Sequence, residues 1–125
     1  MDYKLESGAK LSVTQSSYED AIDLNDELLK SFGEISLTDD IVNKIKTAAS
    51  SPVVRRCIMK CAERAVYENV RVSKELFDDP KLGVQARKDY FEICFRIVEV
   101  NCYPFLEGLL SLLKTGKLTS INAPA

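Results

Sequence analysis

The four cysteines are the side chains with the most obvious chemical potential, because thiolates bind metals and attack electrophiles. They are Cys57, Cys61, Cys94 and Cys102. Cys57 and Cys61 lie four residues apart and therefore share one face of a helix. A zinc site usually needs a second close pair and often histidine, but Cys94 and Cys102 lie eight residues apart and the chain has no histidine. The spacing favours buried, reduced thiols over a metal site, so we expect no metal and no cofactor.

A second group of chemically active residues is a basic run within one predicted helix. It consists of Arg55, Arg56, Lys60 and Arg64. Cations at this helical spacing could follow a phosphate backbone, contact the acidic helix of a neighbouring subunit, or form a solvated surface. The sequence leaves these three alternatives open.

Catalysis has little support in the residue types present. Without histidine, the chain has no Ser-His or Cys-His nucleophile system. Gly83 and Gly108 are isolated, so no glycine-rich phosphate loop is present. A glycosidase-like carboxylate pair is not excluded, but a small helical chain offers little room for the cleft that it needs. We therefore expect a protein that is not an enzyme.

The elements that must position these residues fit one domain of 125 residues. The net charge of −2 conceals an asymmetry. Residues 1–40 contain three Lys/Arg and ten Asp/Glu, whereas residues 53–74 contain six Lys/Arg and two Glu. The sequence has no signal-peptide pattern at Met1–Glu6 and no apolar run of the roughly 18 residues that span a bilayer. These features predict a cytoplasmic protein with an acidic front and a basic middle.

The chain begins with a predicted β-hairpin at about residues 3–15, with its turn at Ser7-Gly8-Ala9. A lone hairpin is marginally stable, so it must lie on helices or pair with another chain. Ser16 and Glu19 form a capping-box pattern for a helix to about Ser31. Its predicted apolar stripe is Tyr18, Ala21, Ile22, Leu28, Leu29 and Phe32.

Three more helical stretches are predicted from apolar periodicity and from their start and stop residues. A short helix runs from Thr38 to about Ala49, and a longer one begins at Ser51-Pro52 and continues to about Phe77. A fourth begins near Val84 and is broken or kinked near Val100 by Pro104. The fold class is therefore mainly α, with four to five helices and a short N-terminal β-hairpin, in a single domain of residues 1–116. Residues 117–125 are predicted to form a flexible tail.

The segment after Pro104 is unusually apolar and continues as a final helix to Gly116. A domain of this size has limited interior, so these side chains either fill the core or form an exposed interaction surface. The candidates for an apolar interface are Phe105, Leu109, Leu110 and Leu113.

Several stretches resemble the tail assembly chaperones of long-tailed bacteriophages. The most specific is Glu99-Val100-Asn101-Cys102-Tyr103-Pro104-Phe105-Leu106-Glu107-Gly108-Leu109, although Cys102-Tyr103 replaces more ordinary aliphatic residues. The others are Cys61-Ala62-Glu63-Arg64-Ala65-Val66-Tyr67, Glu75-Leu76-Phe77-Asp78-Asp79, Arg87-Lys88-Asp89-Tyr90, and the opening hairpin followed by Tyr18-Glu19-Asp20-Ala21. The resemblance covers most of residues 3–113.

The resemblance implies a helical chaperone without catalytic activity. Such a protein binds the tape measure protein, keeps it soluble, and helps recruit tail tube subunits during tail assembly. It also implies self-association into rings or spirals in the host cell cytoplasm, absence from the finished virion, and in many members a longer frameshifted form. The alternative from the residues alone is a small helical DNA-binding regulator that uses the basic helix 53–74.

Overall fold

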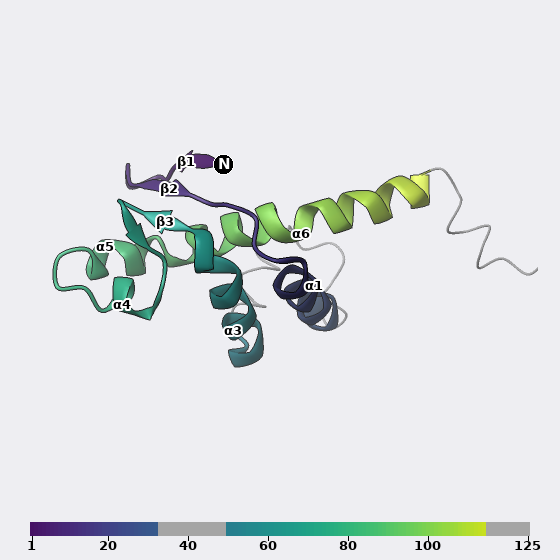
Figure 1. The fold of residues 1–125 in the computed structure, drawn as a ribbon, viewed down its shortest axis with the longest axis horizontal. Coiled ribbons are helices and arrows are strands. Elements are labelled where there is room, and N and C mark those ends of the chain that lie inside the picture. The colour runs from purple at the N-terminus through teal and green to yellow at the C-terminus, as the bar shows by residue number, and fades with distance from the viewer. Residues whose placement is uncertain (33–49, 115–125) are drawn as a thin grey trace, which may run out of the picture.

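The computed structural model describes residues 1–32 and 50–114, with only the backbone described for residues 32, 106 and 109–114. In this part the fold is mainly helical, with a small antiparallel sheet near the N-terminus, as predicted (Figure 1). The elements are β1 (Asp2–Lys4), β2 (Lys10–Ser12), α1 (Tyr18–Phe32), α3 (Pro52–Cys61), the 3-10 helix η1 (Ala62–Arg64), β3 (Val66–Tyr67), β4 (Val70–Arg71), α4 (Lys74–Phe77), α5 (Gly83–Lys88) and α6 (Tyr90–Lys114).

The N-terminal hairpin is confirmed, and its partner is another part of the same chain. β1 and β2 pair antiparallel with Tyr3 opposite Leu11, and Gly8 takes the positive φ of 92° that the turn requires. β2 then pairs with β3, with Leu11 opposite Tyr67, to give a sheet in the order β1-β2-β3-β4. Leu11 and Tyr67 are both fully buried. The hairpin therefore gains the support that two strands alone lack.

The prediction of one helix from Ser51 to Phe77 is wrong after Cys61. The start is correct: Ser51 is the N-cap and Pro52 is at the first helical position. After η1, however, β3 and β4 form a second hairpin whose turn residues, Glu68 and Asn69, have φ values of 46° and 65°. This is the geometry of a tight two-residue hairpin turn, in which Asn is favoured. The helix therefore ends before this turn, although the apolar spacing of the sequence continues past Cys61.

Helix α1 is confirmed, but its cap and its buried face differ from the prediction. The hydroxyl of Ser17, not that of Ser16, accepts a hydrogen bond from the backbone N–H of Asp20 at 3.3 Å. The buried face consists of Ala21, Leu24 and Leu28. Of the predicted stripe, Ala21 and Leu28 are indeed buried, whereas Tyr18 is 69% exposed and Leu29 is 48% exposed.

Helix α6 forms the long axis of the molecule and contacts α1, α3 and α5 (Figure 1). It runs through Pro104 without interruption, so the predicted division into two helices is wrong. Its first half supplies the centre of the core with Ile93, Cys94, Ile97 and Val98. None of the described helices is long and apolar enough to cross a membrane. The predicted helix 38–49 and the predicted tail 117–125 lie outside the described residues.

Candidate functional site

An open groove lies between α3, α4, α5 and the start of α6. Its volume is about 1030 Å³. The lining combines five cations with an apolar floor; we call it the basic groove, and its residues are Pro52, Arg55, Arg56, Met59, Lys60, Lys74, Phe77, Asp78, Arg87 and Tyr90. The sequence-predicted Arg55, Arg56 and Lys60 therefore do meet at one surface, because they share a face of α3 with Pro52 and Met59.

Arg64 does not belong to the basic groove. It lies on η1, and its Nη1 donates to the carbonyl of Gln15 at 3.3 Å. Two groove cations were missed from sequence, Lys74 of α4 and Arg87 of α5. They reach the groove only because the β3–β4 hairpin turns the chain back toward α3, and no local spacing in the sequence indicates that return.

The floor of the groove is built by a close approach of α5 to α4. A side chain at Gly83 would place its Cβ 2.8 Å from the carbonyl oxygen of Phe77, so only glycine fits there. The same carbonyl accepts a hydrogen bond from Nε of Arg87 at 2.9 Å, and Nη2 of Arg87 lies 3.1 Å from Asp78. The ring of Phe77 packs edge-on against Tyr90, with centroids 5.5 Å apart.

Charge in the groove is unbalanced. Arg87 has Asp78 as its ion-pair partner. Within the part of the chain that the structure describes, Arg55, Arg56, Lys60 and Lys74 have no such partner, and all four are exposed. Burial raises the pKa of Tyr90 to about 12, and the neighbouring Cys94 acts in the same direction. The Tyr90 hydroxyl is therefore neutral near pH 7, and the groove presents an excess of positive charge around apolar and aromatic side chains.

The opposite face of α3 carries α1, which runs antiparallel to it. The thiol of Cys61, at the end of α3, donates to the carbonyl of Asp20 at 3.3 Å near the start of α1. One turn earlier on α3, burial raises the pKa of Cys57, and Glu27 on α1 raises it further. Asp23 and Glu27 of α1 thus lie near the same thiol as Arg56 and Lys60, so the acidic helix borders the basic groove along Cys57.

The cysteines behave mainly as core residues. Cys61, Cys94 and Cys102 are buried, and Cys57 is half-buried. Burial raises the pKa of Cys61 and Cys94 to about 11 and that of Cys102 to about 12. Among residues 1–32 and 50–114, no group of three or more His, Cys, Asp or Glu side chains is placed to hold a metal ion. These thiols therefore remain protonated near neutral pH.

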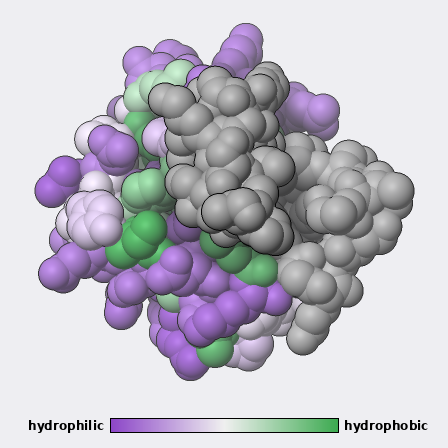
Figure 2. Space-filling view, turned by 90° about the vertical axis from the view of Figure 1, so that its right-hand side faces the viewer, coloured by the Kyte–Doolittle hydropathy of each residue, from purple (hydrophilic) through white to green (hydrophobic). Residues whose placement is uncertain are grey.

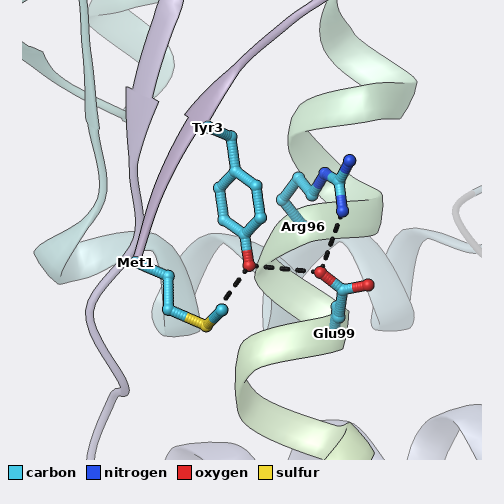
Figure 3. A network of polar contacts seen from close by, with 4 residues as sticks. All are labelled: Met1, Tyr3, Arg96 and Glu99. Carbon is cyan, nitrogen blue, oxygen red and sulfur yellow. Dashed lines mark hydrogen bonds and ion pairs between the residues drawn. The ribbon is translucent and has the colours of Figure 1, made fainter.

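Polar side chains of α6 hold the N-terminal hairpin in place. Glu99 accepts hydrogen bonds from the hydroxyl of Tyr3 at 3.1 Å and from Nη1 of Arg96 at 3.0 Å, and the Arg96 guanidinium lies over the Tyr3 ring at 4.4 Å (Figure 3). The Tyr3 hydroxyl also lies 3.5 Å from Sδ of Met1, on its other side (Figure 3). These contacts hold the N-terminal hairpin against α6.

Asp89 makes a comparable connection just before α6. Its Oδ2 accepts hydrogen bonds from the hydroxyls of Ser7 at 2.6 Å and Tyr67 at 2.7 Å. Burial raises the pKa of Tyr67, and the hydrogen bond to Asp89 adds to the effect. This carboxylate, the most buried one in the described residues, is thus engaged by both hairpins at once.

Three aromatic side chains lie where α6 leaves the core, on two different sides of that helix: Tyr18 and Phe105 on the side of α1, and Tyr103, two residues before Phe105, on another face. Tyr18 and Phe105 pack edge-on with centroids 6.4 Å apart, and Tyr103 is 52% exposed. From this end of the molecule, apolar side chains interrupt a mainly hydrophilic surface (Figure 2). Of the predicted apolar interface, Phe105 is half-buried; the side chains of Leu109, Leu110 and Leu113 lie outside the described part.

Comparison of the chain with protein-family models, curated proteins and solved structures found no match.

Proposed function

We propose that this chain is a tail assembly chaperone of a long-tailed bacteriophage. It binds the tape measure protein, keeps that protein soluble, helps recruit tail tube subunits and catalyses no reaction. Support comes first from the sequence resemblance, whose longest stretch, Glu99–Leu109, lies entirely on α6. This most specific stretch therefore falls on one continuous helix.

The observation that carries the proposal is the exposed aromatic surface on and beside α6. Tyr103 is 52% exposed although Asn101 and Cys102 are buried, so it lies on the face of α6 that points away from the core. Tyr18, which is 69% exposed, packs on the half-buried Phe105. Exposed aromatic side chains that adjoin an apolar helix are typical of surfaces that bind another helix. A long helical client supplies such partners, and repeated weak contacts along it would add up to useful avidity.

The polar interior also supports a binding role. Asp89, Glu99 and Asn101, in α6 and the residue before it, each bond to the N-terminal segment. Glu92 of α6 also accepts a hydrogen bond from the backbone N–H of Glu6. These contacts hold the N-terminal hairpin and the start of α1 on α6.

The test is co-expression of the chain with a tape measure protein from a long-tailed phage. The wild-type chain should keep the client in the soluble fraction, and Tyr103→Asp should reduce the soluble client severalfold, because a charge on this exposed face of α6 must be desolvated when a client helix packs there. Val84→Asp is the matched control, since Val84 is 68% exposed and lies on α5.

Equal client solubility with and without the wild-type chain would contradict the proposed function. Loss of solubility with both variants would show a general defect and not a surface effect. Far-UV circular dichroism of each purified variant separates that outcome from misfolding.

DNA binding has one observation in its favour, the four cations of the basic groove that have no ion-pair partner among the described residues. Against it, a duplex along α3 would also meet carboxylates of α1, since Asp23 and Glu27 lie near Cys57. Arg64 does not continue the groove. A gel-shift titration on duplex DNA at low salt checks this second candidate, because phosphate contacts weaken steeply with salt.

A further inference from the structure

We propose that the basic groove binds an acidic peptide segment of another protein, with a carboxylate of that segment beside Arg55 and Lys74 and an apolar side chain on the groove floor. This inference goes beyond the proposed function, because the groove lies around the start of α6, near α4 and α5 (Figure 1). Tyr103 follows Tyr90, a groove residue, by thirteen residues, which is about 20 Å along the helix. The groove is therefore a separate surface from the one that the client assay tests.

The floor of the groove is apolar and only partly covered. Phe77 and Tyr90 pack edge-on with ring centroids 5.5 Å apart, and both rings are half-buried. Met59 of α3 lines the same groove and is also half-buried. Since the pKa of Tyr90 is raised to about 12, its hydroxyl adds no negative charge near pH 7. The floor can therefore bury one aliphatic or aromatic side chain of a bound peptide, which is the usual anchor of such a contact.

Positive charge is concentrated beside this floor. Arg55 lies close enough to Tyr90 to act on its hydroxyl. Lys74 precedes Phe77 by one turn of α4, so the two side chains share a face of that helix. Arg55 and Lys74 are exposed, and among the described residues neither forms an ion pair. An anionic group placed against the aromatic rings would thus meet cations from two different helices.

The two carboxylates of the chain that lie nearest to this part of the groove are engaged elsewhere. Asp78 pairs with Arg87, with its Oδ1 at 3.1 Å from Nη2 of the guanidinium. Glu75 is exposed, does not line the groove, and lies near Arg71 as well as near Lys74. The two cations beside the floor therefore keep charge for a carboxylate that comes from a ligand.

The border of the groove with α1 has a different charge balance. Arg56 and Lys60 act on the thiol of Cys57, and so do Asp23 and Glu27 of α1. Two cations and two carboxylates thus share that border, and a negative ligand gains less there than at the aromatic floor. The charge distribution therefore places the acidic part of a bound peptide on the side away from α1.

The groove combines features that a peptide can match and a nucleic-acid duplex cannot. A duplex carries phosphates along its whole length but offers no apolar side chain to the floor, and along α3 it would also approach the carboxylates of α1. An open groove of about 1030 Å³ also leaves a small ligand largely exposed to water. A peptide with acidic and apolar side chains close together uses both the charge and the floor.

The experiment measures the affinity of synthetic peptides for the full chain by fluorescence anisotropy. Each probe is a fluorescein-labelled, C-terminally amidated peptide with two Asp residues placed at varied spacings around one Leu or Phe. At least one spacing should bind, and replacement of its Asp residues by Asn should weaken binding by about tenfold. Replacement of the Leu or Phe by Ser, at unchanged charge, should weaken binding by about fivefold.

Two variants of the chain test where the carboxylate binds. Arg55→Gln/Lys74→Gln should weaken binding of the best peptide by about tenfold, because both cations beside the floor are lost. Arg56→Gln/Lys60→Gln removes the same charge at the border with α1 and should weaken binding by only about twofold to threefold, because carboxylates lie nearby. The comparison separates a located contact from a general effect of net charge.

A matched control removes equal charge from another part of the surface. Lys81 and Lys88 are exposed and do not line the groove, so Lys81→Gln/Lys88→Gln should bind the peptide like the wild type. Far-UV circular dichroism checks that each variant is folded. If Arg55→Gln/Lys74→Gln does not fold, the two single variants replace it, and each should weaken binding by about threefold.

The inference is overturned if no peptide of the series binds, or if the Ser peptide binds as tightly as its apolar parent. A larger loss in Arg56→Gln/Lys60→Gln than in Arg55→Gln/Lys74→Gln would also overturn it. Tighter binding of a fluorescein-labelled DNA duplex or single strand than of any peptide would assign the groove to nucleic acid. A wild-type mass above 14.0 kDa in light scattering that returns to 14.0 kDa in Arg55→Gln/Lys74→Gln would assign it to a second copy of the chain.

The outcome is independent of the proposed function. The titration contains no client protein, so failure of every peptide leaves the client assay unaffected. Tyr103→Asp, which should reduce client solubility, should bind the acidic peptide like the wild type, because Tyr103 does not line the groove.

Discussion

The backbone N–H and the hydroxyl of Ser16 both donate to Oδ1 of Asn101, each at 2.8 Å. Asn101 is fully buried, and its Nδ2 donates to the carbonyl of Ile97 at 2.8 Å. One side-chain amide on α6 thereby satisfies hydrogen-bonding groups of the segment that leads into α1. The contact is partly buried between α6 and the residues that precede α1, so its removal leaves two donors with restricted access to water.

Asn101→Leu should lower the free energy of unfolding by about 1–3 kcal/mol, because the Ser16 N–H would lose its acceptor while remaining partly buried. Ser16→Ala is the milder companion: it removes only the hydroxyl and should cost about 1 kcal/mol. Urea denaturation followed by circular dichroism measures both. Equal effects of the two variants would argue against the role assigned to the backbone contact.

Gly83→Ala and Gly108→Ala should have opposite signs. The Cβ at residue 83 would lie 2.8 Å from the Phe77 carbonyl oxygen, so α5 must move away from α4, at a cost of about 1–3 kcal/mol. At Gly108 a Cβ meets nothing within 4 Å, and alanine in an exposed helix should stabilise by about 0.5–1 kcal/mol. Thermal unfolding of the two variants under one condition tests the contrast.

The β3–β4 turn can be improved. Glu68 and Asn69 both have positive φ, for which Asn-Gly is the favoured pair. Glu68→Asn/Asn69→Gly should raise the stability by about 1 kcal/mol, since a Glu side chain is strained in this conformation. Glu68→Pro should do the reverse, because proline holds φ near −65° and removes the N–H that donates to Lys10. A destabilised Asn-Gly variant would mean that the Glu68 side chain matters more than the turn.

The buried thiols predict a loss of stability at high pH. The pKa values of Cys61, Cys94 and Cys102 are raised from 9.0 to about 11, 11 and 12. Since the unfolded thiols ionise first, stability should be fully present below pH 9 and decline as pH rises toward 11–12. Cys102→Ala should show a shallower decline in urea titrations between these values.

Thiol reactivity gives a second measurement of the same feature. At pH 8, Cys57 should react with Ellman's reagent well before the other three cysteines, because it is half-buried and they are buried. Addition of denaturant should make all four react together. A native chain that releases four equivalents in one fast phase would contradict the burial of Cys61, Cys94 and Cys102.

Local patterns in the sequence predicted much of the fold. The N-terminal hairpin follows from the turn at Gly8, and α3 begins where Ser51-Pro52 indicates. The β3–β4 hairpin was missed because Ala65 and Val66 continue the apolar spacing of α3. The available sign was Asn69, a residue favoured in tight turns, between the strand-forming residues Tyr67 and Val70. The prediction of a break caused by Pro104 was also wrong, because a proline within a helix need not end it when the helix packs on others.

The candidate site was predicted only in part for a similar reason. Arg55, Arg56 and Lys60 are close in sequence, so helical spacing was enough to group them. Lys74 and Arg87 reach the same groove through the β3–β4 hairpin and the close approach at Gly83. Arg64 was included because α3 was expected to continue past Cys61. Tertiary contacts of this kind leave no local pattern in the sequence from which they could be predicted.

The order of synthesis gives the pairing of β2 with β3 a further consequence. Leu11 leaves the ribosome more than fifty residues before Tyr67, and Ser7 and Ser16 wait still longer for Asp89 and Asn101. Closing such distant contacts is slow, and the hairpin has little stability until they form. The N-terminal segment therefore reaches its full set of contacts only once α6 has emerged. In this chain, completion of the fold is coupled to the synthesis of α6, which carries Asn101.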